Sequence, residues 1–236
     1  MTAGTVVTAD RAPAREAGRG ATLRTLIDTG QGAPGLVRTL AELDPAARLD
    51  GEAAGAGELW FVLAGTGQLD LPGQPPIALR PDRGVLLPPG VSYQVSAGPS
   101  EGLRIDRVAL PGPPGGSTAP ASRDFAGCAV EVTGDREFRV LFGPGQGCAV
   151  ATQFVGEIPP GRAPGHSHPY DEVVLILAGR GVAHIGGAEY PLAPGTCAHL
   201  PPGLVHCLEN TGQDTLRVLG VFHPADSPAA KLTEDR

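Results

Sequence analysis

The feature that most constrains the fold of this chain is an internal repeat whose period is the length of a whole domain. Residues 58–67 read ELWFVLAGTG, and residues 172–181, 114 positions later, read EVVLILAGRG. A second pair of blocks, LPPGV at 87–91 and LPPGL at 200–204, is offset by 113 positions, as one inserted residue in the intervening turn would explain. A period this long predicts two consecutive copies of one domain rather than a solenoid.

Each copy is a series of short apolar segments separated by turn-forming residues. The 236-residue chain contains 35 Gly and 25 Pro, which fall between the apolar runs and not in a single tract. Few stretches have the 3.6-residue apolar period of an amphipathic helix. The pattern therefore predicts an all-β protein made of two tandem antiparallel sandwiches or barrels.

Composition also predicts the domain boundaries. Residues 111–122, PGPPGGSTAPAS, have the Pro and Gly content of a linker. We expect loose ends where the sequence is polar and rich in Ala and Pro. The expected segments are a flexible N-terminal segment at 1–21, a first domain at 22–110, the linker at 111–122, a second domain at 123–224 and a flexible tail at 225–236.

Charge and cysteine usage exclude several classes of protein. The formal net charge is −7, and almost all the basic residues are scattered arginines, so we expect no nucleic-acid partner. No run of 18 apolar residues and no apolar leader is present, which predicts a cytoplasmic protein without a membrane partner. The four cysteines have no CxxC spacing, and we interpret them as small buried residues.

The second copy carries four side chains of metal-ligating type at a spacing that can bring them together. His166 and His168 are two residues apart, so on a strand both side chains point to the same face. The proline that follows has no N–H to donate and ends that strand, and Glu172 opens the next strand after a short turn. A Pro-Pro-Gly turn then precedes His206, which begins a returning strand that can reach the same interior point.

These residues form two blocks that resemble both motifs of the cupin family. From Gly161 to Gly179 the chain reads G-x4-HxH-x3-E-x6-G, and from Gly195 to Asn210 it reads G-x5-PxG-x2-H-x3-N. The resemblance implies a bicupin, with two tandem jelly-roll β-barrels at about 22–110 and 123–224. It also implies that one divalent transition metal per chain is bound by His166, His168, Glu172 and His206. Fe(II) is favoured, with Mn, Ni, Cu or Zn as alternatives.

The first copy keeps one of the four ligands. In the repeat alignment, His166, His168, Glu172 and His206 fall on Glu52, Ala54, Glu58 and Tyr93. The first barrel is therefore expected to bind no metal. Trp60 alternates with Glu58 along one strand, so we expect Trp60 and Tyr93 to point into this barrel. There they either fill the space of the lost metal site or form the floor of a small-molecule pocket.

Three residues near the expected metal are candidates for catalysis. Glu172 either stays a fourth ligand or detaches and acts as a general base. Tyr170 lies in the turn between ligands, and His199 precedes the Pro-Pro-Gly turn, so both are candidates to face the open metal positions. Arg162 lies at the expected mouth of the site. It either pairs with a substrate carboxylate or is a solvated loop residue without a role in binding. An apolar lining that includes Val174 would suit an apolar substrate part.

The resemblance implies an enzyme more strongly than a binding protein. A complete set of three His and one Glu resembles the metal-dependent dioxygenases of quercetinase type, which is our first prediction. An oxygen-independent isomerase, decarboxylase or lyase that uses the metal as a Lewis acid is the runner-up. A non-catalytic binding or storage bicupin is the third reading. The expected partner is a small-molecule substrate, and the chain is expected to be a monomer or a homodimer.

Overall fold

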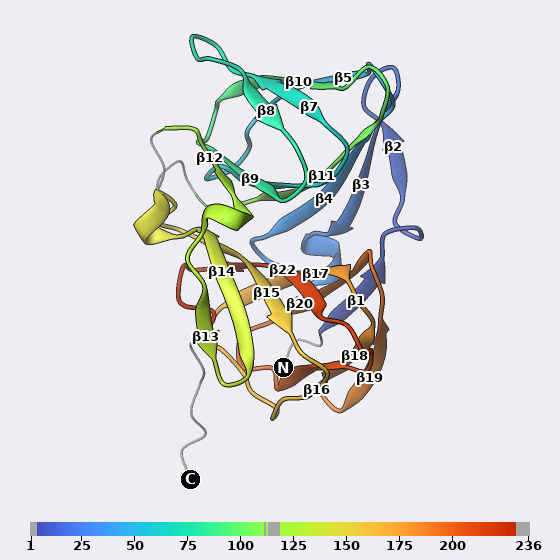
Figure 1. Cartoon of the computed structure of the whole chain (residues 1–236), viewed down its shortest axis with the longest axis vertical. Helices are drawn as coiled ribbons and strands as arrows, with labels where there is room; N and C mark the ends of the chain where they lie inside the picture. Colours follow the sequence, from blue (N-terminus) through green and yellow to red (C-terminus); the bar gives the residue numbers. More distant parts are fainter. Residues whose placement is uncertain (1–3, 111, 113–118, 230–236) are drawn as a thin grey trace.

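Two β-barrels lie one above the other along the long axis of the molecule (Figure 1). The computed structural model of the chain describes residues 4–110, 112 and 119–229. Within these residues the chain forms 22 strands, three short 3-10 helices and no α-helix. The prediction of an all-β protein with two tandem jelly-roll barrels is confirmed.

The first barrel consists of a seven-stranded and a four-stranded antiparallel sheet. The seven-stranded sheet contains, in spatial order, β12 (Ala121–Asp124), β9 (Arg83–Leu87), β6 (Glu58–Ala64), β11 (Leu103–Ala109), β4 (Val37–Leu43), β3 (Ala21–Ile27) and β2 (Ala14–Glu16). The four-stranded sheet contains β5 (Arg48–Glu52), β10 (Ser92–Ala97), β7 (Gly67–Asp70) and β8 (Ile77–Leu79). A 3-10 helix, η1 (Thr29–Gln31), connects β3 and β4.

The second barrel repeats this arrangement. Its seven-stranded sheet contains β1 (Thr5–Thr8), β20 (Thr196–Leu200), β17 (Asp171–Ala178), β22 (Leu216–His223), β15 (Thr152–Ile158), β14 (Arg136–Phe142) and β13 (Glu131–Thr133). Its four-stranded sheet contains β16 (Gly161–Arg162), β21 (His206–Asn210), β18 (Gly181–Ile185) and β19 (Ala188–Leu192). The remaining 3-10 helices are η2 (Phe125–Gly127) and η3 (Pro144–Gln146). The sheet orders correspond strand by strand, as the sequence repeat predicts.

The two barrels exchange their outermost strands. β1 precedes the first barrel in the chain but pairs with β20 of the second, with Thr5 opposite His199. β12 spans the end of the expected linker and the first two residues of the expected second domain, but it pairs with β9 of the first barrel, with Ala121 opposite Leu86. The structure therefore differs from the expectation of a loose segment at 1–21. The four β-branched residues of β1, Thr-Val-Val-Thr, favour a strand, and backbone hydrogen bonds to the other barrel order them.

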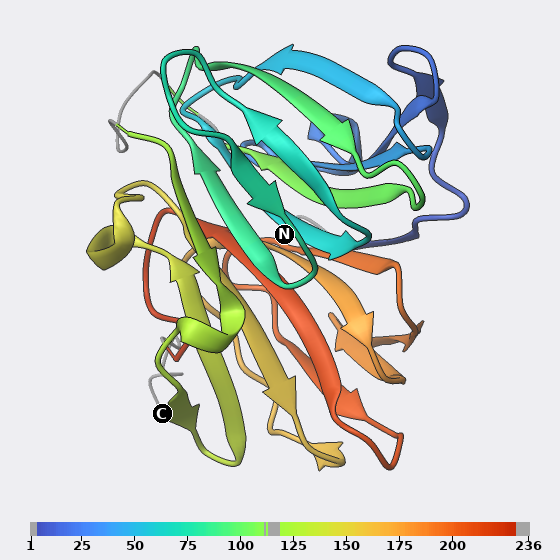
Figure 2. The same cartoon turned by 45° about the horizontal axis from the view of Figure 1, so that its top comes forward.

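The core is divided into the interiors of the two barrels and a layer between them. The middle layer joins the facing large sheets, with Phe61 from the first barrel and Leu175 from the second among its buried residues. It also contains a fully buried ion pair, in which Arg38 Nε lies 2.8 Å from Asp106 Oδ1, and Arg38 Nη2 donates to the Leu219 carbonyl across the layer. Figure 2 shows the same stacking from nearer the top. This layer fixes the two barrels against each other.

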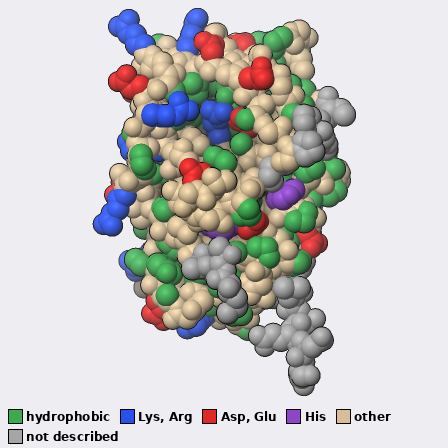
Figure 3. Space-filling view, turned by 180° about the vertical axis from the view of Figure 1, so that it is seen from behind, with side chains coloured by type: hydrophobic (Ala, Val, Ile, Leu, Met, Phe, Trp, Pro, Cys, Tyr) green, Lys and Arg blue, Asp and Glu red, His purple; other side chains and the backbone are tan. Residues whose placement is uncertain are grey.

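The surface of the molecule carries side chains of both charges. On the face shown in Figure 3, Lys and Arg side chains lie in separate groups among acidic and neutral ones. Of the helices in the described part of the chain, none has the length and apolar character needed to cross a bilayer.

Candidate metal centre

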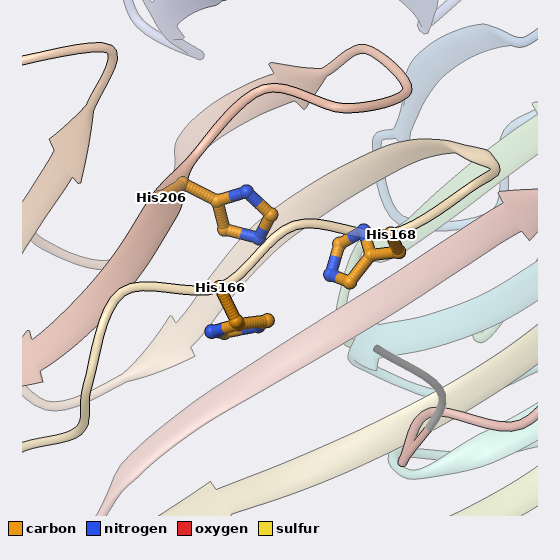
Figure 4. Close-up of side chains that lie close together, drawn as sticks. All are labelled: His166, His168 and His206. Carbon is orange, nitrogen blue, oxygen red and sulfur yellow. The ribbon is translucent and has the colours of Figure 1, made fainter. Parts of the chain in front are cut away.

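Three histidines converge inside the second barrel (Figure 4). His166, His168 and His206 each place a ring nitrogen so that all three atoms lie within 4.8 Å of one another. The His168 and His206 ring centroids are 4.5 Å apart, and those of His166 and His206 are 4.7 Å apart. Across the residues that the structure describes, this is the one group of three or more His, Cys, Asp or Glu side chains with such geometry.

The backbone holds two of these histidines opposite each other. His206 is the first residue of β21, and it exchanges N–H to carbonyl hydrogen bonds of 3.0 and 2.9 Å with His166. That pair is an isolated bridge, so the segment that carries His166 and His168 is extended but is not the continuous strand that we expected. Pro164 and Pro169 flank the segment, and neither can donate to a ladder.

The environment of His206 keeps it in the form that binds metal. Burial lowers its pKa to about 4, so the imidazole is neutral at neutral pH. Its Nδ1 lies 2.8 Å from the carbonyl oxygen of Leu204 and must carry the proton, because a carbonyl only accepts. The lone pair is therefore on Nε2. A fixed tautomer of this kind is typical of a metal-ligating histidine.

Glu172 lies beside the histidine cluster. It is the second residue of β17, its side chain is buried, and its Oε2 is 3.4 Å from His168 Nε2. Neighbouring ligand atoms about 2.1 Å from one ion are about 3 Å apart, so this separation suits a shared ion. Burial raises the pKa of Glu172 to about 8, because little around the carboxylate replaces its hydration. Three imidazoles and one carboxylate fit a divalent transition metal.

The cluster lies at the wall of a cavity of about 190 Å³. Apolar side chains make up most of the lining, among them Phe138, Phe154, Val174 and Leu200. The expected apolar lining around Val174 is therefore present. A lining of this kind suits the apolar part of a small-molecule ligand next to the candidate ligand atoms.

Tyr170 is part of the cavity wall. Its ring is stacked between His168, at a centroid distance of 4.5 Å, and Phe222, at 4.0 Å. Burial raises the pKa of the phenol, so the hydroxyl stays protonated. The hydroxyl donates to the carbonyl of Ser227 at 3.4 Å, and Pro228 of the same segment also lines the cavity. The structure thus places this predicted residue at the site.

His199 lies on the opposite face of the sheet, and the structure contradicts its prediction as a catalytic residue. Leu200 pairs with Glu172 and lines the cavity, so the preceding residue on the strand, which pairs with Val173, points to the layer between the barrels. His199 is fully buried there, with Nε2 2.9 Å from Oδ1 of Asp171. The short distance in sequence between His199 and the Pro-Pro-Gly turn did not determine on which face of the strand its side chain lies.

In the first barrel, Arg107 lies beside Glu58, the counterpart of Glu172 in the repeat. Its Nη2 donates to Glu58 Oε2 at 2.9 Å and to the Tyr93 hydroxyl at 2.5 Å. Trp60 Nε1 donates to the same Glu58 oxygen at 2.6 Å, and its ring makes an edge contact with the ring of Tyr93. Trp60 and Tyr93 therefore point into this barrel, as predicted, and with Arg107 they surround Glu58.

The register of the first barrel differs by one residue from the sequence alignment. Tyr93 is opposite Gly51, whereas His206 is opposite His166, so the structural counterpart of His166 is Gly51 and not Glu52. A side chain at Gly51 would overlap the Tyr93 ring. The absence of a side chain there makes room for the tyrosine.

Sequence reasoning missed the other cavity-lining residues contributed by β14 and β15. Phe138 and Phe154 form an edge-to-face pair with centroids 6.4 Å apart, and Arg136 lines the cavity beside them. The two phenylalanines lie in apolar strands, and alternation alone could have placed them inside. Arg136 follows a Gly-Asp turn, and no feature of the sequence predicted that it would line the cavity. The predicted mouth residue, Arg162, is exposed and does not line this cavity.

Comparison with known proteins agrees with this geometry. The sequence profile of the cupin domain matches residues 154–222, which span most of the second barrel. The second barrel thus contains a cupin domain. An oxalate-binding protein of Thermotoga maritima is 37% identical over 68 residues, 28% of this chain and 56% of that protein. The chain spans about half the length of the curated relatives that it matches.

Solved structures show the same fold over almost the whole of this chain. The Escherichia coli protein Ylba has a TM-score of 0.79 at 15% identity, over 94% of this chain and 91% of that one. A variant of Bacillus subtilis oxalate decarboxylase has a TM-score of 0.78 at 11% identity, over 96% and 79%. At these identities the likeness describes the fold alone.

Proposed function

We propose that this protein is a metal-dependent enzyme that converts a small organic molecule at the cluster of His166, His168 and His206. The observation that carries the proposal is the convergence of these three imidazoles and the buried Glu172 at the wall of a cavity that is lined mostly by apolar side chains. A divalent ion held there would polarise a substrate oxygen as a Lewis acid.

Glu172 would complete the centre as its fourth ligand or serve as its proton-transfer group. A carboxyl that titrates near neutral pH can both accept and return a proton. Tyr170 would hold a protonated hydroxyl at the same wall. The apolar side chains of the cavity would keep bulk water away from both groups.

The reaction that we place first is an oxygen-independent lyase or isomerase step, such as decarboxylation. Two observations support it: local identity to an oxalate-binding protein and the shared fold with oxalate decarboxylase. This reverses the order predicted from sequence, where a dioxygenase came first. A dioxygenase stays the second candidate, because the aromatic and aliphatic lining would also protect a reactive intermediate from water.

Elemental analysis tests the metal centre directly. Protein purified without added metal is expected to contain close to one transition-metal ion per chain. His206→Ala should reduce the count to near zero, because it removes one of the three converging nitrogens. His184→Ala is the matched control, since His184 pairs with Glu209 at 2.8 Å and lies outside the cluster. An unchanged metal count in His206→Ala would refute the proposed site.

Turnover with and without oxygen separates the two reaction classes. Metal-loaded protein is incubated with a panel of small carboxylic acids and enols, and products are followed by NMR. Product formation under strict anaerobiosis, lost in His206→Ala, is the expected result. Turnover that requires one equivalent of oxygen per product would favour the dioxygenase. Metal binding without turnover of any panel member would favour the non-catalytic reading.

A further inference from the structure

Arg136 is a partly buried cation that lines the cavity and has no buried acidic partner. Its side chain is 17% exposed, and its contact with a carboxylate is 3.9 Å, from Nε to Oδ1 of Asp135, whose side chain is 73% exposed. That distance is too long for a hydrogen bond. Within the described residues, Arg136 Nε is buried and has no hydrogen-bond partner.

The other end of the guanidinium is fixed beside the metal centre. Nη2 of Arg136 donates to the carbonyl of Leu208 at 2.9 Å. Leu208 is two residues from His206 on β21, and both residues line the cavity. Two residues of strand span about 7 Å, so the guanidinium lies roughly one small molecule away from the histidine cluster.

The cavity wall between Arg136 and the histidine cluster is aromatic. Phe138, Phe154 and Tyr170 line the cavity and belong to one buried cluster with Phe222. An apolar cavity of about 150 Å³ accommodates a benzene-sized body, and this cavity measures about 190 Å³. The space therefore suits a body of about one ring and a short chain.

We propose that Arg136 binds the carboxylate of a substrate whose apolar, ring-sized body lies against Phe138 and Phe154 and whose reacting end meets the histidine cluster. Guanidinium binds carboxylate through paired, charge-assisted hydrogen bonds. The inference rests on the proposed function for the identity of the reacting end. It names a substrate class, an aryl or alkyl carboxylate whose reacting group is separate from the carboxylate bound by Arg136, that differs from a small dicarboxylate such as oxalate.

Two observations support this role over a purely structural one. The hydrogen bond to Leu208 uses one donor and leaves Nε buried and unpaired, which costs free energy unless a ligand supplies an acceptor. Burial also lowers the pKa of Arg136, as expected for a charge that the protein solvates incompletely. The one buried carboxylate lining the cavity, Glu172, belongs to the metal centre.

Calorimetric titration of metal-loaded protein with phenylacetate, phenylacetamide and oxalate tests the assignment. Phenylacetate is expected to bind at least tenfold more tightly than the amide, which has the same ring without the charge. It should also bind more tightly than oxalate, which has the charge without the ring. Arg136→Gln should reduce the carboxylate-to-amide ratio to near one. Arg162→Gln, an exposed arginine near the site, should leave the ratio unchanged.

The outcomes distinguish this inference from the proposed function. Two outcomes would overturn the role of Arg136: equal binding of acid and amide to the wild-type protein, or an unchanged ratio in Arg136→Gln. If the metal count is normal in these experiments, the proposed metal centre is unaffected. Tighter binding of oxalate would overturn the apolar substrate class. A missing metal would instead refute the proposed function. If Arg136→Gln does not fold, Arg136→Lys keeps the charge but not the paired geometry, and an intermediate ratio is expected.

Discussion

The two barrels share a scaffold but surround equivalent buried glutamates, Glu58 and Glu172, with different side chains. In the first barrel, Glu58 is bound by Arg107, whose guanidinium carbon also lies 5.0 Å from the ring centroid of Trp60. In the second, Glu172 lies beside three histidines and a cavity. By strand register, the counterpart of Arg107 is Gly220, since Arg107 pairs with Trp60 and Gly220 pairs with Val174.

This difference shows how one side chain can occupy a duplicated site. Arg107 carries a permanent positive charge on a side chain long enough to reach both Glu58 and Tyr93. Gly220 carries no side chain, and the Phe154 ring lies against its backbone. The first barrel thus holds an internal cation beside its glutamate, and the second has a cavity beside its own.

The largest expected effect comes from removing the internal cation. Arg107→Met should lower the free energy of unfolding by about 3–5 kcal/mol, because it leaves Glu58 buried without its partner. Chemical denaturation measures the change. Arg104→Met on the same strand is the control, since the Arg104 contact with Glu42 is partly exposed and should cost less than about 1 kcal/mol. Adding Glu58→Gln to Arg107→Met should recover part of the loss. Equal costs for the two arginines would contradict the comparison.

A smaller effect is expected at the counterpart in the second barrel. Gly220→Ala should destabilise the protein by about 1–3 kcal/mol, because the new methyl group would overlap the Phe154 ring. Since Phe154 lines the cavity, ligand affinity should fall as well. Thermal and denaturant unfolding measure the first effect. Gly145→Ala is the control, because no atom lies within 4 Å of the added group there. A neutral Gly220→Ala would mean that the cavity is not tightly packed at this point.

The metal centre should also make ion affinity depend on pH in a defined direction. Glu172 has a pKa of about 8 in the metal-free protein, so below that value an ion must displace its proton. Mn²⁺ affinity should therefore rise by about tenfold per pH unit between pH 6.5 and about 8 and then level off. His206 adds nothing in this window, because its pKa is about 4. EPR of free Mn²⁺ under anaerobic conditions measures the affinity. A slope that persists in Glu172→Gln would assign the proton to another group.

The smallest effect is expected at Tyr170, whose counterpart in the repeat is the small residue Ala56. Tyr170→Phe keeps both ring stacks and removes a long hydrogen bond to Ser227, so stability should change by less than about 1 kcal/mol. Metal content should stay the same. Steady-state kinetics then isolates the hydroxyl: a loss of kcat with an unchanged melting temperature would support a role in proton transfer. Tyr190→Phe, in a partly exposed strand, is the control for a hydroxyl outside the site.

The candidate ligands could be found from sequence because each motif encodes local geometry. Alternation on an extended segment places His166 and His168 together, and a Pro-Pro-Gly turn returns the chain at His206. The same reasoning failed for His199, since one residue of register moves a side chain to the other face of a sheet. It also gave no strand for 5–8, which is ordered by pairing with β20.

The sequence by itself determined the duplication, the all-β architecture and the set of histidines in the second copy, because these follow from periods and spacings within short segments. Only the tertiary structure decided what surrounds them. The strand exchange, Arg107 at Glu58, the stacking of Tyr170 and the exposure of Arg136 to the cavity all join residues far apart in the chain. Such contacts depend on the packing of whole sheets, which no local pattern specifies.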